Sequence, residues 1–360
     1  MDSFKNYLAS GGEDDKMYLW CYTDDIINNN NNQNGDDEDY SKKLQLLIES
    51  EKFKDSVTNV KFSCDGKYVA ACDMSGIIRV YLIETKELHW QYDVENDVEC
   101  MDWHPNCNVL FCGTSDGNFF MFKLSTNEIK IMYCGEEQAL SCFRILKDGK
   151  RAACCYNNGS VRIWDLKTSQ PLFNYSNAHE NEILCMDLSS DGNLLATGGV
   201  DMKIHLVNTL NGKFIAKLDC SFKKKQAEAA SGSSEDEEDS IESIAFSKNL
   251  PLLACATLNG SLIVWDMNTH MMRSKHENEN KLGYSKLVWT NVSSTNPSLN
   301  EIVYASSLDG TVQVYDGRNL QLIKKFTCHK SEILDFCLNN TLNLFITGSN
   351  DSLIKVFKQV

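Results

Sequence analysis

The chain has 360 residues, with 35 Lys and Arg against 50 Asp and Glu, which gives a formal net charge of −15 at pH 7. This charge argues against direct binding to nucleic acid or to an anionic membrane, because both depend on Lys and Arg meeting phosphate, and it favours a basic partner. No stretch reaches the roughly 18 apolar residues of a membrane span. Met1 is followed by Asp2 rather than by a basic and then an apolar stretch, so we expect no secretory signal, a cytoplasmic location with the nucleus as an alternative, and free thiols for the 15 cysteines.

One pattern occurs eight times along the chain: Asp, Asn or Ser, then five residues, then an aromatic or large apolar residue. The pairs are Asp14 and Trp20, Ser75 and Tyr81, Asp116 and Phe122, Asn158 and Trp164, Asp201 and Val207, Asn259 and Trp265, Asp309 and Tyr315, and Asp351 and Phe357. In five copies Gly follows the polar residue, and Asp-Gly and Asn-Gly are typical of hairpin turns because both residues tolerate positive φ. The shorter intervals between copies are about 42 residues, the period of a four-stranded propeller blade.

The residues around each turn predict strands. In the second copy, residues 57–62, 68–71, 77–81 and 88–92 have β-branched and aromatic runs without a helical period, and predict strands a to d, from the inside of a blade to its outside. We therefore expect an all-β protein, a single eight-bladed β-propeller over residues 1–360 with almost no helix. The chain has room for strand b at 7–10 but little for a strand a before it, and none for a strand d after Phe357. The first and last blades are therefore expected to be incomplete.

Two of the longer intervals contain insertions that cannot bury apolar area and are expected to be disordered. Residues 24–40 are rich in Asn and Asp and should lie in a c–d loop, where an insertion without function is the simpler interpretation. Residues 221–240 are acidic and Ser-rich and fall between strands d and a. This second insertion could help to capture a basic partner, or be an insertion that the fold tolerates.

Acidic residues gather where the chain runs into strand a, on one face of the predicted propeller at the mouth of its central channel. Carboxylates placed there would attract Lys- and Arg-rich segments; the alternative is that the loops of an acidic protein are acidic without a role. The candidate partner-binding residues are Glu13, Asp15, Asp97, Glu99, Glu180, Glu182, Glu242 and Glu332, with Glu136, Glu137 and Glu277 nearby. A second set is expected to accept hydrogen bonds within the b–c turns and to be structural: Asp14, Asp116, Asp201, Asp309 and Asp351.

The repeated units resemble WD repeats. Trp164-Asp165 and Trp265-Asp266 are the dipeptide that names these repeats. Two units come close to the hydrogen-bonded set of His, Thr, Asp and Trp that WD blades often contain. These units have His179, Thr197 and Asp201, with Val207 in the Trp position, and His329, Thr347 and Asp351, with Phe357 in that position.

Seven short segments, in order along the chain, resemble the angio-associated migratory cell protein family. They are residues 11–16, 55–58, 73–76, 103–105, 148–151, 162–167 and 332–336. The resemblance implies an eight-bladed WD-repeat propeller. It also implies a function: the fungal branch is a dedicated chaperone for a basic large-subunit ribosomal protein, whose N-terminal segment lies on an acidic face, whereas animal members are associated with cell migration and receptor signalling. Compared with the family, this sequence lacks an acidic N-terminal extension and adds the Asn tract, so no role of that extension is transferred.

No motif that we identify indicates a cofactor, a metal or catalysis. No Gly-x-x-x-x-Gly-Lys loop occurs, and the adjacent Cys328 and His329 have no second ligand pair at zinc spacing. We therefore expect a non-enzymatic monomer that binds a basic protein or peptide, most simply as a chaperone for a ribosomal protein in ribosome assembly. The alternatives are a signalling or cell-migration scaffold and a substrate receptor of a ubiquitin ligase. The second alternative comes from the resemblance of residues 315–318, which end in Arg318, to a Trp-Asp-x-Arg box.

Overall fold

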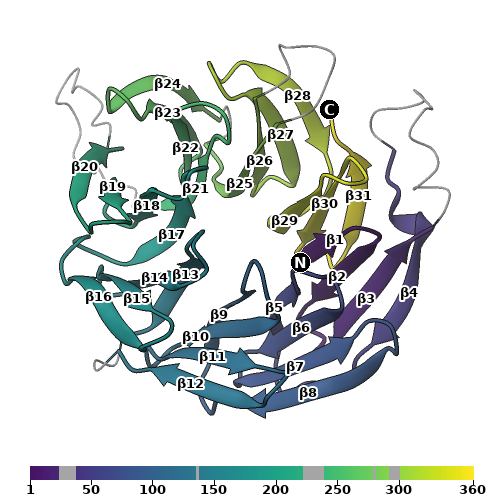
Figure 1. The fold of residues 1–360 in the computed structure, drawn as a ribbon. Helices are drawn as coiled ribbons and strands as arrows, with labels where there is room; N and C mark the ends of the chain where they lie inside the picture. Colours follow the sequence, from purple (N-terminus) through teal and green to yellow (C-terminus); the bar gives the residue numbers. More distant parts are fainter. Residues whose placement is uncertain (24–37, 135–137, 222–238, 279–280, 292–300) are drawn as a thin grey trace, which may run out of the picture.

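Eight antiparallel sheets surround a central axis in the computed structural model, which describes residues 1–23, 38–134, 138–221, 239–278, 281–291 and 301–360 (Figure 1). Each sheet is one blade of a β-propeller, numbered 1 to 8 along the chain, so the predicted fold class is confirmed. The described residues contain one short 3-10 helix, η1 (Ser41–Lys43), and no helix long and apolar enough to cross a membrane.

The strands of each blade follow one another in space as they do in sequence. Blade 1 contains β1 (Asp2–Phe4), β2 (Tyr7–Gly11), β3 (Met17–Tyr22) and β4 (Leu44–Glu49); blade 2 contains β5 (Val57–Phe62), β6 (Tyr68–Asp73), β7 (Ile77–Leu82) and β8 (Glu87–Asp93). Blade 3 contains β9 (Val98–Trp103), β10 (Val109–Thr114), β11 (Phe119–Lys123) and β12 (Glu128–Met132); blade 4 contains β13 (Leu140–Ile145), β14 (Arg151–Tyr156), β15 (Val161–Asp165) and β16 (Gln170–Tyr175). Blade 5 contains β17 (Ile183–Leu188), β18 (Leu194–Gly199), β19 (Lys203–Asn208) and β20 (Phe214–Asp219); blade 6 contains β21 (Ile241–Phe246), β22 (Leu252–Thr257), β23 (Ser261–Asp266) and β24 (Met271–Glu277). Blade 7 contains β25 (Tyr284–Thr290), β26 (Ile302–Ser307), β27 (Thr311–Asp316) and β28 (Leu322–Thr327); blade 8 contains β29 (Ile333–Asn339), β30 (Leu344–Ser349) and β31 (Ile354–Lys358).

The b–c turn of every blade places one residue in the left-handed region of backbone space. In the five blades with Gly after the turn residue, the φ of that glycine lies between 77 and 97°. The other three blades have Asp15, Met202 and Ser352 at this position, with φ of 65, 57 and 63°. Non-glycine residues are uncommon in this region, so the repeated hairpin imposes its turn even where the local sequence does not favour it.

The apolar core lies between neighbouring blades. Trp164 of blade 4, 2% exposed, packs with Phe111 and Phe119 of blade 3, whose ring centroids lie 5.4 Å apart. Truncation of such a buried aromatic side chain to Ala typically costs about 3–5 kcal/mol. Each blade is therefore held mainly by the two beside it, and the position of the loops at one end of the propeller follows from this stacking.

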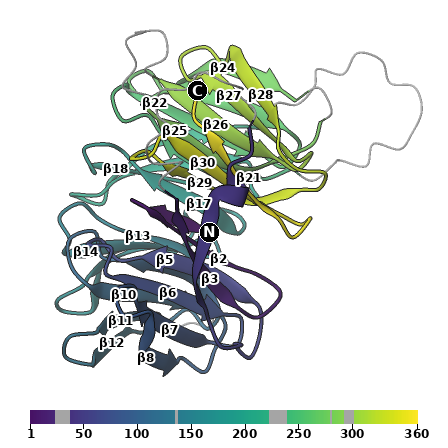
Figure 2. The same cartoon turned by 90° about the vertical axis from the view of Figure 1, so that its right-hand side faces the viewer.

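The predicted absence of an inner strand in blade 1 is wrong. β1 pairs with β2 and lies beside both β5 and β29, so the ring of inner strands closes (Figures 1 and 2). The Asn339 side chain donates from Nδ2 to Ser3 Oγ (2.9 Å) and to the Lys5 carbonyl (2.6 Å), which ties blade 8 to blade 1. A three-residue strand shows no alternation that a pattern could reveal, which is why sequence analysis missed it. The expected three-stranded last blade is confirmed.

The open edge of blade 8 is covered by a segment of blade 1. The Tyr40 amide donates to the Val356 carbonyl of β31 (2.8 Å), and the Val356 amide donates to Asp39 Oδ1 (3.3 Å). Residues 24–37 and 222–238 of the two predicted insertions lie outside the described residues. The predicted disorder does not extend to the last residue of either insertion, because Tyr40 and Ser240 are both buried. Covering an edge strand in this way limits its pairing with other chains.

Candidate peptide-binding face

The d–a connections and the b–c turns lie at the same end of the blades, which we call the top face. In blade 3 the amide of Ser115, in the b–c turn, donates to the carbonyl of Asp97, the last residue before strand a (3.0 Å). The same hydrogen bond, also 3.0 Å, joins the b–c turn to Glu182 in blade 5 and to Glu332 in blade 8. The repeat therefore places three of the predicted carboxylates at equivalent positions around the axis.

Glu99, on the inner strand β9, lies in a strongly negative environment. Burial raises the pKa of Glu99, and the charges of Asp97 and Glu182 raise it further. The charges that act on Glu99 therefore come from carboxylates of both blade 3 and blade 5. Among the described residues, none of these three carboxylates has a cation within ion-pair distance.

Two more carboxylates are held on the top face by neutral hydrogen bonds. Ser240 Oγ donates to Glu242 Oε1 (2.5 Å) and Ser331 Oγ donates to Glu332 Oε2 (2.6 Å). The hydrogen bond from Ser331 lowers the pKa of Glu332, so this side chain stays charged at neutral pH. We call the carboxylates without a described cationic partner the acidic rim: Glu13, Asp97, Glu99, Glu182, Glu242 and Glu332.

The structure does not bring every predicted residue into this set. Glu180 Oε1 lies 2.5 Å from Lys203 Nζ and 3.8 Å from Lys217 Nζ, which neutralise it. Asp15 pairs with Lys52 (3.4 Å). The neighbouring Glu277 pairs with Lys275 (2.8 Å), and Glu136 and Glu137 lie outside the described residues.

The five turn aspartates each accept a hydrogen bond from the amide two residues further along. The distances to the amides are 3.3 Å for Asp14, 3.4 Å for Asp116, 3.1 Å for Asp201, 3.0 Å for Asp309 and 3.1 Å for Asp351. This contact fixes the b–c turn, and it leaves these carboxylates less free to bind a partner than those of the acidic rim.

Two turn aspartates also belong to a buried polar set. His179 Nδ1 lies 2.9 Å from Asp201 Oδ1, and His179 Nε2 lies 2.8 Å from Thr197 Oγ1. Burial opposes the charge of Asp201, but the hydrogen bond from His179 lowers the pKa of Asp201 to about 2. His329, Thr347 and Asp351 repeat the arrangement in blade 8.

The inner strands carry a belt of charges that sequence analysis did not single out. Lys286 Nζ lies 2.7 Å from Asp335 Oδ1, and the two side chains keep 40% and 35% of their surface exposed. Burial opposes the charge of Lys286, but Asp335 raises its pKa. Five further charges alternate in sign at equivalent positions, each opposite the third residue of strand b: Asp2, Lys61, Asp102, Arg144 and Asp187. In blades 2 to 5 the fifth residue of the inner strand is charged, and this repeated position was the signal that could have revealed them.

One segment has the Gly-x-Ser-x-Gly pattern of a hydrolase nucleophile, contrary to the expectation that no catalytic motif is present. Residues 113–117 contain Ser115 at its centre. In the structure these residues form the b–c hairpin turn of blade 3, between β10 and β11. A nucleophile elbow instead joins a strand to a helix, so the pattern here belongs to the propeller repeat.

Family models match the repeats that the structure displays. Residues 128–165, 169–208, 229–266 and 320–358 match the WD domain, G-beta repeat, and residues 19–106 match the anaphase-promoting complex subunit 4 WD40 domain. The fold and its repeats define a WD-repeat β-propeller, and proteins of this class are typically non-enzymatic.

Comparison with individual proteins narrows the assignment. The chain is 35% identical over 360 residues to the angio-associated migratory cell protein of Homo sapiens, covering 99% of this chain and 76% of the relative. It belongs to the angio-associated migratory cell protein family, which confirms the resemblance seen in the sequence. It is also 24% identical over 313 residues to the ribosome assembly protein SQT1 of Saccharomyces cerevisiae, covering 79% of this chain and 68% of the relative. A crystal structure of Chaetomium thermophilum Sqt1 bound to the N-terminus of the ribosomal protein L10 has the same fold, with a TM-score of 0.78 at 20% identity and coverage of 98% and 93%.

Proposed function

We propose that the acidic rim binds a basic segment of a ribosomal protein, and that this protein is a monomeric cytoplasmic chaperone for that partner. The observation that carries the proposal is that the charges of Asp97 and Glu182 act on Glu99, while none of the three has a described cationic partner. A Lys or Arg side chain placed among these carboxylates would relieve their mutual repulsion, and complementary charge of this kind also speeds encounter.

The inner-strand belt points to the rim rather than the interior of the channel as the place of binding. Lys286 and Asp335 pair with each other, and burial raises the pKa of Asp187, an effect that the Phe246 amide and the charge of Arg144 oppose. The belt therefore supplies its own counter-charges. The acidic rim above it does not, so a basic segment gains more by binding there.

The relatives support a ribosomal partner. The Sqt1 structure holds the N-terminus of ribosomal protein L10, and SQT1 is a ribosome assembly protein. Those relatives share 20% and 24% identity with this chain, so the support lies in the common fold together with the acidic rim.

Capture of the partner tests the proposal. The wild-type protein is used as bait at low and at moderate salt, beside a double variant, Glu182→Lys with Glu332→Lys. The matched control, Glu84→Lys with Glu128→Lys, makes the same charge change on exposed residues away from the top face. We expect mass spectrometry to find a basic large-subunit ribosomal protein with the wild type and the control, and to find it depleted with the rim variant. Equal recovery with all three baits, or recovery of no ribosomal protein at low salt, would contradict the proposal.

A further inference from the structure

Exposed large apolar side chains are distributed unequally over the described residues. Eight lie on the outer strands d, and Leu210 lies in a c–d turn at the end opposite the acidic rim. Seven lie on the top face, in b–c turns, in d–a connections or near the start of strand a: Met74, Tyr133, Val200, Leu258, Leu282, Leu334 and Leu353. Single exposed apolar residues are normal on a protein surface, so their position relative to the acidic rim decides whether they have a role.

A β-bulge at the second residue of strand a gives one of these leucines the same place as two rim carboxylates. In blades 2 to 8 the register with strand b skips this residue, and the skipped residues are Thr58, Glu99, Ser141, Leu184, Glu242, Ser285 and Leu334. A bulge turns the side chain of the extra residue away from the regular alternation of the strand. Glu99 and Glu242 belong to the acidic rim, and Leu334, at the equivalent position of blade 8, is 62% exposed. The repeat therefore presents carboxylates and a leucine in one layer around the axis.

The b–c turns bring two further exposed apolar residues next to rim carboxylates. The amide of Val200 donates to the carbonyl of Glu182 (3.0 Å), and the amide of Leu258 donates to the carbonyl of Ser240 (3.0 Å). Ser240 is also the residue whose hydroxyl holds Glu242. In blades 5 and 6 an exposed apolar side chain therefore accompanies each rim carboxylate.

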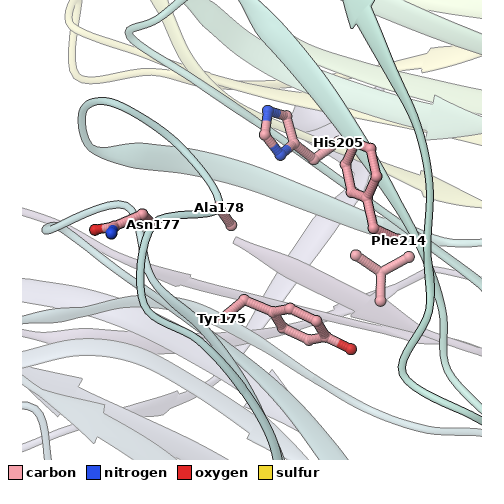
Figure 3. Close-up of a pocket in the computed structure, with 6 residues that line it drawn as sticks. Tyr175, Asn177, Ala178, His205 and Phe214 are labelled. Carbon is pink, nitrogen blue, oxygen red and sulfur yellow. The ribbon is translucent and has the colours of Figure 1, made fainter.

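The apolar surface of the outer strands is not combined with the acidic rim in this way. Phe214 of β20 lines a pocket of about 370 Å³ together with Tyr175 and Val207, between blades 4 and 5 (Figure 3). None of the residues that line this pocket belongs to the acidic rim. Only on the top face do charge and exposed apolar surface occur together, so only there do both define the chemistry of an occupant.

The charge of the top face identifies that occupant as a basic polypeptide. A second copy of this chain would bring another acidic rim, and two chains with a net charge of −15 each repel one another. An anionic membrane is repelled for the same reason. A basic segment is attracted, and apolar side chains next to its Lys and Arg residues then meet Val200, Leu258 and Leu334.

We infer that the top face selects basic segments in which apolar side chains stand between the Lys and Arg residues. The inference rests on the proposed function of the acidic rim and adds a sequence preference to it. A run of Lys and Arg alone satisfies the carboxylates but leaves Leu258 and Leu334 in water, whereas an apolar side chain covers them. In an extended segment every second side chain lies on the same side, so an apolar residue two positions from a basic one faces the same surface. Its burial also gives binding a negative change in heat capacity.

The test compares two blocked peptides of equal length and charge by calorimetric titration. One is Arg-Ser-Leu-Ser-Arg-Ser-Leu-Ser-Arg-Ser-Leu-Ser-Arg, and the other has Ser in place of every Leu. We expect the leucine peptide to bind the wild type at least about fivefold more tightly, with a more negative change in heat capacity. Equal affinity of the two peptides would overturn the inference and leave the acidic rim standing. Binding of neither peptide at low salt would contradict the proposed function and the inference with it.

Three double variants locate the preference on the top face. Leu258→Ser with Leu334→Ser should bind the two peptides equally, while its affinity for the serine peptide stays that of the wild type. Leu258→Met with Leu334→Met keeps an apolar surface and should keep the preference. The matched control, Leu88→Ser with Leu322→Ser, makes the same change on exposed residues of outer strands and should also keep it. A preference that persists in the top-face serine variant, or that is lost in the outer-strand control, would overturn the inference. Thermal melts of all variants show that each protein is folded.

Discussion

The charge of Glu182, which precedes the inner strand of blade 5, acts on Glu99 of the inner strand of blade 3: burial raises the pKa of Glu99, and the charges of Asp97 and Glu182 raise it further. Neither has a described cationic partner, although 35 Lys and Arg are present in the chain. Elsewhere on the same face Glu180 and Asp15 do have partners. The propeller thus leaves negative charge on part of its top face without a described cationic partner.

Removal of the charge at Glu99 should stabilise the protein and weaken its function. Because its pKa is raised in the folded state, the ionised form opposes folding at pH 7, and Glu99→Gln should add a few tenths of a kcal/mol, up to about 1, to the free energy of unfolding. The gain should disappear as the pH falls through the raised pKa, where wild-type Glu99 is protonated. Denaturant unfolding at pH 7 and pH 4 measures this, with Glu84→Gln as the control. A loss of stability at pH 7 would show that Glu99 has a partner that we have not identified.

The buried pair of Asp201 and His179 should show the opposite pH dependence. The pKa of Asp201 is about 2 in the folded protein against an ordinary value of 3.8, so its contribution to stability is present above pH 4 and is lost as the pH falls toward 2. Asp201→Asn should therefore cost about 1–2 kcal/mol at neutral pH, and this cost should shrink in acid. Unfolding measured from pH 7 to pH 3 tests the prediction, with the exposed Glu87→Gln as control. A cost that does not change with pH would mean that packing, rather than charge, is what Asp201 contributes.

Closure of the ring should depend on Asn339. Its side chain is 3% exposed, donates to Ser3 and to the Lys5 carbonyl, and accepts from the Leu342 amide (3.1 Å). Asn339→Ala should cost about 2–3 kcal/mol, because buried partners lose their hydrogen bonds. Hydrogen exchange should rise first in β1 and β29, whereas Asn6→Ala in the exposed β1–β2 turn should change little. Faster exchange spread evenly over all blades would contradict a local role in closure.

Arg318 should not take part in binding a basic segment. Its guanidinium donates to Asp316 from Nε (2.9 Å) and from Nη2 (2.6 Å), within a single blade and at the end of the sheet opposite the acidic rim. Arg318→Ala should change the affinity for a basic peptide less than twofold and the stability by at most about 1 kcal/mol. Co-purification of a ubiquitin-ligase adaptor in equal amount, lost in this variant, would instead support the ligase interpretation.

The repeat made most of the fold predictable. The six-residue spacing from the turn residue to the aromatic or apolar residue of strand c holds in all eight blades. Even Met202 and Ser352, whose residue types do not favour positive φ, have a positive φ in these turns. The pattern failed to predict a strand that is too short to show alternation and a segment that lies outside the repeat. The strand at Asp2–Phe4 has three residues, and Tyr40 packs on β31 through contacts made far along the chain.

The site was less predictable than the fold. The spacing located Asp97, Glu182 and Glu332 correctly at the start of inner strands, since backbone register fixes them. It could not show that Glu180 turns to Lys203, because that choice depends on a side chain of another strand. Nor could it show that Tyr175 of blade 4 and Val207 and Phe214 of blade 5 line a common pocket, which depends on the packing of two blades.

Calorimetric titration of a Lys- and Arg-rich peptide into the wild type and into Glu182→Lys with Glu332→Lys tests the acidic rim most directly. The account predicts that the double variant binds about 2 kcal/mol more weakly at low salt, roughly 30-fold, with a flatter dependence on salt and an unchanged melt. The charge-matched Glu84→Lys with Glu128→Lys should bind like the wild type. Equal affinity of the wild type and the rim variant, with both proteins folded, would contradict the claim that these carboxylates form the binding site.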